Sequence, residues 1–282
     1  MYSYSLGLYE KAFPVSSPLR DKLEAAKRCG FDHMELCIDP EPSRAERINW
    51  TLRQARDVRH MAEDVGVPFK TFSLTLLRKW PLGLPSQADN EKAFDVLKKG
   101  VDIASELGSR VMLINGYDVY GEPSTPETRA HFMENLPRVV EICSRAGMPV
   151  GIENAEQEFC FSVTRAMEII SGISSPFIGV YADMGNSANS VNGDVDASMA
   201  DIRTGAGHIF AMHVKDTVPG EYRYTRYGEG HVNFDRAIAL AKELEIRLFT
   251  AELFCRTDDF AEAEKEALRV DRFIRGYFDK EI

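Results

Sequence analysis

The amino-acid sequence predicts an α/β fold of the (β/α)8 type, a TIM barrel. Eight short apolar runs alternate with segments of helical periodicity along 282 residues, and this number of units at this length fits such a barrel. A doubly wound sheet is the main alternative, but it usually has a glycine-rich turn after its first strand, and Leu6-Gly7-Leu8-Tyr9 offers none. No Ser/Gly-rich linker, low-complexity tract or repeat divides the chain, so we expect residues 1–282 to form one barrel domain.

The eight predicted strands are apolar runs bounded by polar or turn residues, as is typical of strands buried on both faces. They cover residues 5–9, 33–38, 69–74, 110–115, 149–153, 178–182, 209–212 and 248–251. Helical spacing of apolar residues predicts helices at residues 19–29, 52–65, 90–107, 126–146, 163–170, 197–204, 234–244 and 260–278. Gly30, Gly66, Gly108 and Gly147 follow four of these helices, where a left-handed residue commonly ends a helix.

Composition excludes several classes of function. The formal net charge is -10 and no local basic patch is visible, which argues against nucleic acid as a partner. No run reaches the ~18 apolar residues of a membrane span, and residues 1–11 lack the basic start and apolar core of a signal peptide. The cysteines are odd in number and form no CxxC pair, so we expect reduced thiols in a cytoplasmic protein. They are Cys29, Cys37, Cys143, Cys160 and Cys255.

Potential metal ligands close the last four predicted strands. Strands five to eight end, in order, in Glu153, Asp183, His213 and Glu252. Because the active site of such a barrel lies at the C-terminal ends of its strands, we expect these side chains to meet on one divalent ion. Three carboxylates and an imidazole favour Mn²⁺, with Co²⁺, Mg²⁺ and Zn²⁺ as alternatives. Singly, each carboxylate could be a helix cap and the histidine a core residue, but four at successive strand ends favour a metal site.

Longer motifs extend this pattern over nearly the whole chain. These motifs are LGLYEKAFP at 6–14, RKWPLG at 78–83, GYDVY at 116–120, IEN at 152–154, DMGN at 183–186, HVKDTVPG at 213–220 and YGEGHVNF at 227–234. In these motifs the sequence resembles the sugar isomerase/epimerase group of xylose-isomerase-like barrels, and within it the L-ribulose-5-phosphate 3-epimerase-like (L-xylulose-5-phosphate 3-epimerase) members.

The resemblance implies a fold, a cofactor and a reaction. It implies a xylose-isomerase-like barrel whose divalent metal is held by the four strand-end residues, with Glu153 and Glu252 also acting as the catalytic acid/base pair. The implied reaction inverts carbon 3 of a pentulose 5-phosphate, L-xylulose 5-phosphate to L-ribulose 5-phosphate, by proton abstraction through an enediolate. Such chemistry needs one proton-transferring group on each face of the carbon and positive charge near the enediolate oxygens.

Substrate contacts are predicted from charge and position. A phosphate group needs cations or free backbone N–H groups, and the loops after strands three and seven supply cations. The candidates are Arg78, Lys79, Lys215 and Arg223 or Arg226. Asn186 stands where relatives that act on free ketoses tend to have histidine, which favours the phosphopentose branch. Glu35 on strand two is either a partner for a sugar hydroxyl or a satisfied carboxylate inside the barrel.

Two other kinds of function remain open at this point, and a third is disfavoured. The first is epimerisation or aldose–ketose isomerisation of an unphosphorylated ketose at the same site. The second is a non-catalytic sugar-binding barrel, which would not need two glutamates on the metal. An apurinic endonuclease, which uses a related barrel, is disfavoured because only six histidines are present and the chain is acidic. The expected partner is a small sugar phosphate, not nucleic acid or membrane, with homodimer and homotetramer both open.

Overall fold

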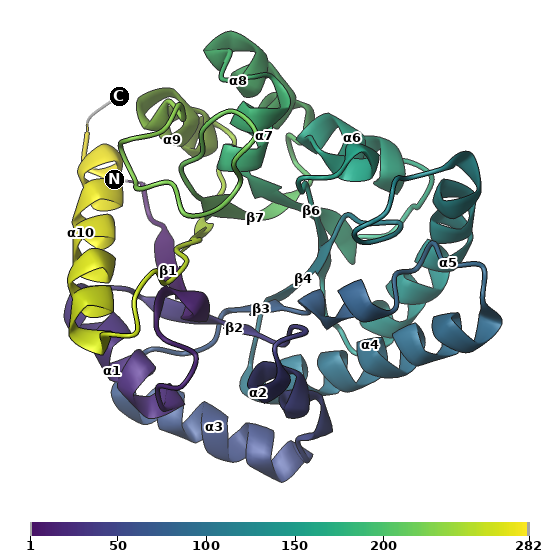
Figure 1. Ribbon diagram of the computed structural model, residues 1–282, viewed down its shortest axis with the longest axis horizontal. Coiled ribbons are helices and arrows are strands. Elements are labelled where there is room, and N and C mark those ends of the chain that lie inside the picture. Colours follow the sequence, from purple (N-terminus) through teal and green to yellow (C-terminus); the bar gives the residue numbers. More distant parts are fainter. Residues whose placement is uncertain (1, 281–282) are drawn as a thin grey trace.

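The computed structural model describes residues 2–280 and contains a closed barrel of eight parallel strands (Figure 1). Each strand pairs with its neighbours in chain order, and β8 closes the ring against β1 through pairs such as Leu8 with Ala251. The predicted fold class is therefore confirmed. The strands are β1 (Ser5–Tyr9), β2 (His33–Cys37), β3 (Thr71–Ser73), β4 (Val111–Asn115), β5 (Val150–Glu153), β6 (Ile178–Asp183), β7 (Ile209–Val214) and β8 (Leu248–Ala251).

Helices surround the strands on the outside of the barrel (Figure 1). The longer ones are α1 (Leu19–Cys29), α3 (Leu52–Val65), α4 (Gln87–Leu107), α5 (Pro126–Arg145), α6 (Val163–Ile170), α8 (Val195–Thr204), α9 (Phe234–Glu243) and α10 (Phe260–Phe278). Shorter helical segments are α2 (Pro42–Ala45), α7 (Met184–Ser190) and the 3-10 turns η1 (Glu10–Ala12), η2 (Glu46–Asn49), η3 (Thr75–Lys79) and η4 (Glu158–Cys160). Within residues 2–280, no helix is long and apolar enough to cross a membrane.

Several observed elements differ from the predicted ones, and the differences at α4 and α7 have local causes. Helix α4 begins at Gln87, three residues earlier than predicted, because Ser86 caps it by accepting a hydrogen bond from the Asp89 backbone N–H. Strand β3 is shorter than the predicted 69–74. Helix α7 was not predicted, since its sequence MGNSANS is rich in residues of low helix propensity. Asp183 caps this helix, so one carboxylate both ends β6 and starts α7.

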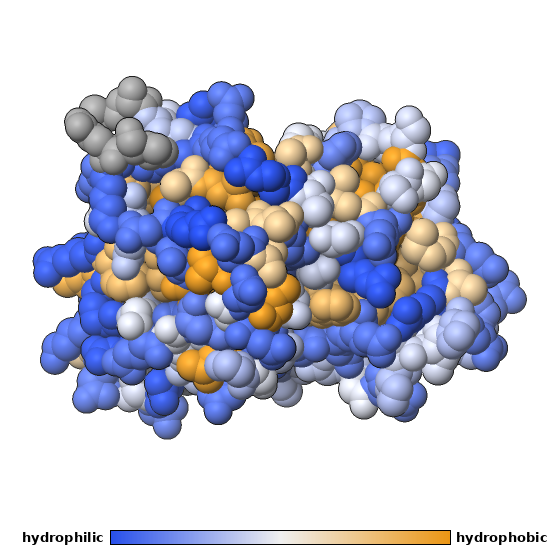
Figure 2. Space-filling model, turned by 90° about the horizontal axis from the view of Figure 1, so that it is seen from above, coloured by the Kyte–Doolittle hydropathy of each residue, from blue (hydrophilic) through white to orange (hydrophobic). Residues whose placement is uncertain are grey.

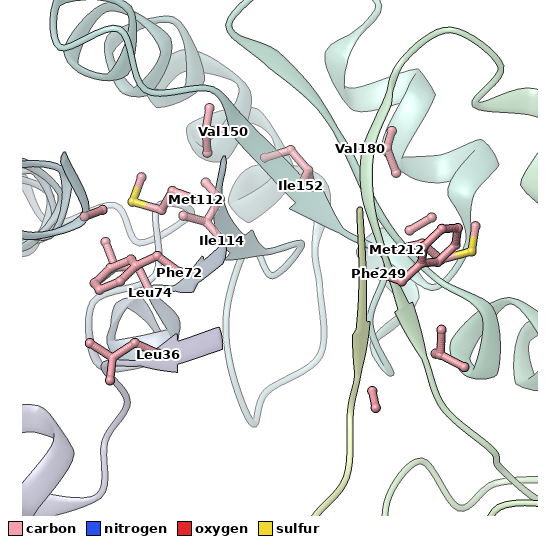
Figure 3. Close-up of a cluster of buried hydrophobic side chains, with 14 of the residues drawn as sticks. Leu36, Phe72, Leu74, Met112, Ile114, Val150, Ile152, Val180, Met212 and Phe249 are labelled. Atoms are coloured by element: carbon pink, nitrogen blue, oxygen red, sulfur yellow. The ribbon is translucent and has the colours of Figure 1, made fainter. Parts of the chain in front are cut away.

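Alternation along the strands separates the outside of the barrel from its inside. Large apolar side chains from successive strands form the cluster shown in Figure 3, which includes Leu36, Phe72, Met112, Val180 and Phe249. The residues next to them in sequence point to the other side, because successive strand residues face opposite ways. The described core is therefore mainly a layer between strands and helices. Polar side chains cover most of the face of the molecule seen in Figure 2, with apolar patches between them.

The inside of the barrel contains a polar network as well as apolar residues. Tyr181 Oη donates to Glu35 Oε2 at 2.6 Å and lies 3.2 Å from Thr250 Oγ1, which in turn lies 3.3 Å from Thr71 Oγ1. All four residues are fully buried. This network crosses the barrel and ends beneath His213, whose Nε2 lies 2.9 Å from Glu35 Oε1. It thus forms a rigid floor for the side chains at the C-terminal ends of the strands.

Candidate active site

The structure gathers the four predicted metal ligands at the C-terminal end of the barrel. Glu153 ends β5 and Asp183 ends β6. His213 lies one residue before the end of β7, and Glu252 directly follows β8. Each offers a nitrogen or oxygen atom within 4.8 Å of those of the other three, and all four are buried. Parallel pairing explains the meeting, because Asp183 lies opposite His213 in the register of β6 and β7. The four positions come from consecutive strands, as the sequence predicted.

His213 lies at the centre of this cluster and is held from below. Its Nδ1 lies 3.0 Å from Glu153 Oε1 and 3.9 Å from oxygens of both Asp183 and Glu252. Its Nε2 is held by Glu35 at 2.9 Å, as in the carboxylate–histidine pairs that orient metal-binding imidazoles. Burial alone would lower the pKa of His213, but Glu35 and Glu252 raise that pKa well above its usual value. The same negative surroundings would attract a metal cation to Nδ1.

The carboxylates have oxygen atoms left over for a cation. Asp183 Oδ2 and Glu252 Oε2 are buried without an aligned hydrogen bond, although Lys215 Nζ lies 2.7 Å from each. Burial raises the pKa of Asp183 to about 7. Burial acts in the same direction on Glu252, but Lys215 and His213 outweigh it and lower the pKa of Glu252 to about 2. Buried, unsatisfied oxygens beside an imidazole fit a divalent cation with oxygen and nitrogen ligands.

Asparagine side chains hold one carboxylate and the backbone of a second acidic residue, and the sequence did not single out Asn115 and Asn154. Asn115 Nδ2 donates to Glu153 Oε2, and Asn154 Oδ1 accepts from the Asp183 backbone N–H at 2.7 Å. Asn115 closes β4, one strand before Glu153, so the strand-end rule that identified the four ligands could have identified it too. Asn186, a predicted substrate contact, is buried and donates to the Asn154 carbonyl at 2.7 Å.

A basic and aromatic cluster lies above this end of the barrel. Arg78 lies over the rings of Tyr117 and Tyr120, with 5.4 and 4.9 Å between its guanidinium carbon and the ring centroids. Arg223 donates to Glu156 Oε1 at 2.6 Å, and the Tyr117 hydroxyl donates to the other oxygen of Glu156. Among the described residues, no carboxylate lies within ion-pair distance of Arg78, and its buried Nε has no hydrogen-bond acceptor. The cluster therefore has an uncompensated cation.

The remaining predicted substrate contacts lie elsewhere. Lys79 is exposed and lines a groove between η2 and α4, together with Ile48 and Lys99. Lys215 is only 6% exposed and lies between two carboxylates of the cluster, not in an open loop. Glu35 is fully buried, and both of its oxygens are hydrogen-bonded. This favours a satisfied carboxylate inside the barrel over a partner for a sugar hydroxyl. Of the predicted phosphate-binding residues, Arg78 and Arg223 lie in the cluster above the strand ends.

A cavity of about 230 Å³ borders one side of the site. Lys215 and Glu252 lie in its wall, with Tyr224 and Tyr227 from the loop after β7 and Phe254 from the segment after β8. The loop after β7 is anchored by Asp216, whose carboxylate accepts hydrogen bonds from the backbone N–H groups of Gly228, Gly230 and Val232. This anchoring fixes the loop that carries Arg223.

Comparison with known proteins agrees with this architecture. Residues 23–275 match the family model described as xylose isomerase-like TIM barrel. The chain belongs to this family. It is also 33% identical, over 238 residues, to the L-ribulose-5-phosphate 3-epimerase UlaE of Escherichia coli K12, with 84% of this chain and 82% of that protein covered. The corresponding protein of Escherichia fergusonii is 32% identical over the same shares. The relatives place this family member among the isomerases, as an enzyme of the sugar-epimerase type.

Solved structures share the fold at lower identity. A structure titled L-ribulose 3-epimerase has a TM-score of 0.75 at 16% identity and covers 98% of this chain and 93% of its own. The IOLI protein, whose title mentions a bound zinc atom, has a TM-score of 0.77 at 15% identity, with 98% and 100% covered. At such identities the likeness concerns the barrel fold.

Proposed function

We propose that this family member is a metal-dependent epimerase that inverts carbon 3 of a pentulose 5-phosphate and so interconverts L-xylulose 5-phosphate and L-ribulose 5-phosphate. The observation that carries the proposal is the placement of two glutamates around one cation-binding cluster. Glu153 and Glu252 come from β5 and β8, which are separated by two intervening strands, and both face His213 Nδ1. The similarity to L-ribulose-5-phosphate 3-epimerases supports the choice of carbon 3 and of the phosphate.

In the proposed reaction the two glutamates work on opposite faces of carbon 3. One carboxylate takes the proton next to the carbonyl, which leaves an enediolate, and the other carboxyl group returns a proton to the opposite face. A divalent ion held by the cluster, which we expect to be Mn²⁺ first, would supply positive charge beside the enediolate oxygens. Asn115 keeps Glu153 in place, and Lys215 together with His213 keeps the Glu252 carboxylate ionised.

The basic and aromatic cluster that contains Arg78, Tyr117, Tyr120, Glu156 and Arg223 supports a phosphorylated substrate. Arg78 has no carboxylate partner among the described residues, and its buried Nε lacks an acceptor. A phosphate oxygen would satisfy this donor, whereas a free hydroxymethyl group would leave the positive charge uncompensated. Arg223, half-buried and paired with Glu156, is the second cation on this side. We therefore assign the phosphate end of the substrate to Arg78 and Arg223.

Isotope exchange tests the two-glutamate mechanism. In deuterated water, the wild-type enzyme should place deuterium at carbon 3 of both epimers of the pentulose 5-phosphate. Glu153→Gln and Glu252→Gln keep an oxygen ligand but remove the base, so each should lower turnover by about 10²–10⁴-fold. If a variant still exchanges the carbon 3 proton of one epimer without inverting that carbon, the remaining glutamate is assigned to the face from which this proton is taken. Absence of solvent deuterium in both products of the wild type would overturn the mechanism.

Substrate comparison tests the phosphate. Arg78→Ala should raise KM for the pentulose 5-phosphate with a smaller change in kcat, since a charge-assisted hydrogen bond contributes about 1.5–3 kcal/mol. The matched control is Lys79→Ala, the neighbouring cation that faces away toward the groove beside α4. Equal turnover of the free pentulose at equal concentration would instead support a free-ketose epimerase.

A further inference from the structure

Lys215 occupies a position inside the carboxylate cluster, where it touches neither the phosphate end of the proposed substrate nor an open loop. It follows β7 two residues after His213, so the alternation of the strand directs both side chains to the same side. Its ammonium lies 2.7 Å from Asp183 Oδ2 and 2.7 Å from Glu252 Oε2, and the residue is 6% exposed. A lysine whose charge is buried among the candidate metal ligands does not lie with Arg78 and Arg223, to which we assign the phosphate end of the substrate.

Lys215 and a bound divalent ion would offset the negative charge of the same carboxylates. Glu153, Asp183 and Glu252 bring three negative charges into a buried space, where unpaired charge is costly. The ammonium of Lys215 offsets one of these charges in the metal-free cluster. Without Lys215, the three carboxylates would retain one more negative charge in both the metal-free and the metal-loaded site.

The geometry indicates that the ammonium holds two of the ligands together. The nearest oxygens of Asp183 and Glu252 each lie 2.7 Å from Nζ, so one buried cation pairs with both carboxylates. A divalent ion bound by the same two carboxylates would lie close to the ammonium and would be repelled by it.

We propose that Lys215 is a built-in counter-cation of the metal site, which keeps the metal-free cluster assembled and weakens its affinity for the divalent ion. The inference rests on the metal site of the proposed function. It predicts two effects of opposite sign when the charge is removed. The metal-free protein loses a stabilising cation and becomes less stable. The metal-bound protein loses a repulsive neighbour and binds its ion more tightly.

Calorimetric titration of Mn²⁺ into chelator-treated protein, with thermal unfolding in chelator and in saturating Mn²⁺, tests the proposal. Lys215→Met should lower Tm in chelator, bind Mn²⁺ at least about tenfold more tightly, and show a larger rise of Tm on metal binding. Lys215→Gln removes the charge but keeps a donor, so it serves if the Met variant does not fold without metal. Lys98→Met, at an exposed position on α4, should behave as wild type.

The outcomes separate this inference from the function on which it rests. If wild type binds Mn²⁺ and both Lys215 variants bind it equally or more weakly, Lys215 is not a counter-cation, while the metal site stands. Tighter binding by either variant with an unchanged Tm in chelator would overturn the assembling role. Failure of wild type to bind Mn²⁺, Co²⁺, Mg²⁺ or Zn²⁺ would overturn both the inference and the metal dependence of the proposed function.

Discussion

The two ends of the barrel each contain a fully buried histidine, and the two differ only in their neighbours. His33 begins β2 and His213 lies near the end of β7, so they occupy opposite ends of a parallel barrel. Burial, with Lys70 and Arg110 nearby, lowers the pKa of His33 to about 3. At His213 burial acts in the same direction, but surrounding carboxylates reverse it. Burial beside basic groups therefore favours a neutral imidazole at His33, whereas the carboxylates around His213 make the same kind of side chain a candidate metal ligand.

Removal of His213 should give the largest difference between the two ends. His213→Ala should lose most Mn²⁺ affinity and lower kcat/KM by about a thousandfold or more, since a Lewis-acid metal contributes several kcal/mol. Wild type treated with chelator should lose activity to a similar extent and recover it on addition of Mn²⁺. His33→Gln is the matched control and should keep both properties. Activity of His213→Ala within tenfold of wild type would remove the functional contrast between the ends.

Glu35 is the residue that links His213 to the floor of the barrel, and its replacement should have an intermediate effect. Glu35→Gln weakens the hydrogen bond at Nε2 that orients Nδ1 toward the carboxylates, so metal affinity should fall by about 10–100-fold. Tyr181→Phe removes the other hydrogen bond to Glu35 but leaves the histidine contact, and should cost less. Titration calorimetry with Mn²⁺ measures both. Equal losses in the two variants would mean that Glu35 acts on the whole floor and not through His213.

The histidine at the N-terminal end should appear in the pH dependence of stability. Its pKa in the folded protein, about 3, is below the usual 6.5, so the unfolded chain binds a proton that the folded protein rejects. Stability is therefore fully retained above pH ~6.5 and lost as pH falls toward 3, by about 1.4 kcal/mol per pH unit. Urea unfolding at pH 7.5 and 5.5 should show a loss about 1.4 kcal/mol smaller in His33→Gln than in wild type. Identical pH profiles would contradict the pKa assigned to His33.

The smallest effect is expected at Ser5, which supports His33. Ser5 Oγ lies 3.1 Å from His33 Nδ1 and accepts a hydrogen bond from Lys70 Nζ at 2.8 Å. Ser5→Ala should lower the free energy of unfolding by about 1 kcal/mol and leave kcat/KM unchanged. Ser3→Ala, two residues away at an exposed position, provides the control. A change in kcat/KM would show that the two ends of the barrel are coupled.

The comparison also shows what the sequence could predict. The ends of the strands could be predicted from the sequence, because an apolar run that stops at a polar residue marks both the strand and the position of its last side chain. Four candidate ligands on consecutive strands could therefore be proposed, and the structure brings them together. The depth of a side chain inside the barrel could not be predicted. Nothing in the strand sequence HMELC shows that Glu35 lies below the site and not in it. The direction of side chains in loops could not be predicted either. Arg78 and Lys79 are adjacent in one 3-10 turn, yet Arg78 lies over Tyr117 and Lys79 lines the groove beside α4.

Lys215 was visible in the sequence, but its place between two carboxylates was not predicted. The spacing of two from His213 puts it on the inward side of the strand, and that spacing could have indicated a position in the cluster. Charge alone suggested a phosphate contact, because a lysine after a barrel strand is a common anion-binding residue. The structure instead pairs it with Asp183 and Glu252.

The closure of β8 on β1 has a consequence for how the protein is made. During synthesis the N-terminal half emerges first, and it contains Glu35 but none of the four cluster residues, which lie between 153 and 252. Until β8 has left the ribosome, the strands β1 and β7 each lack one of the partners that they have in the closed ring, and unpaired strand edges are prone to wrong pairing. The residue that follows this closing strand is Glu252. A cation site made of all four residues would therefore be complete only once the ring has closed.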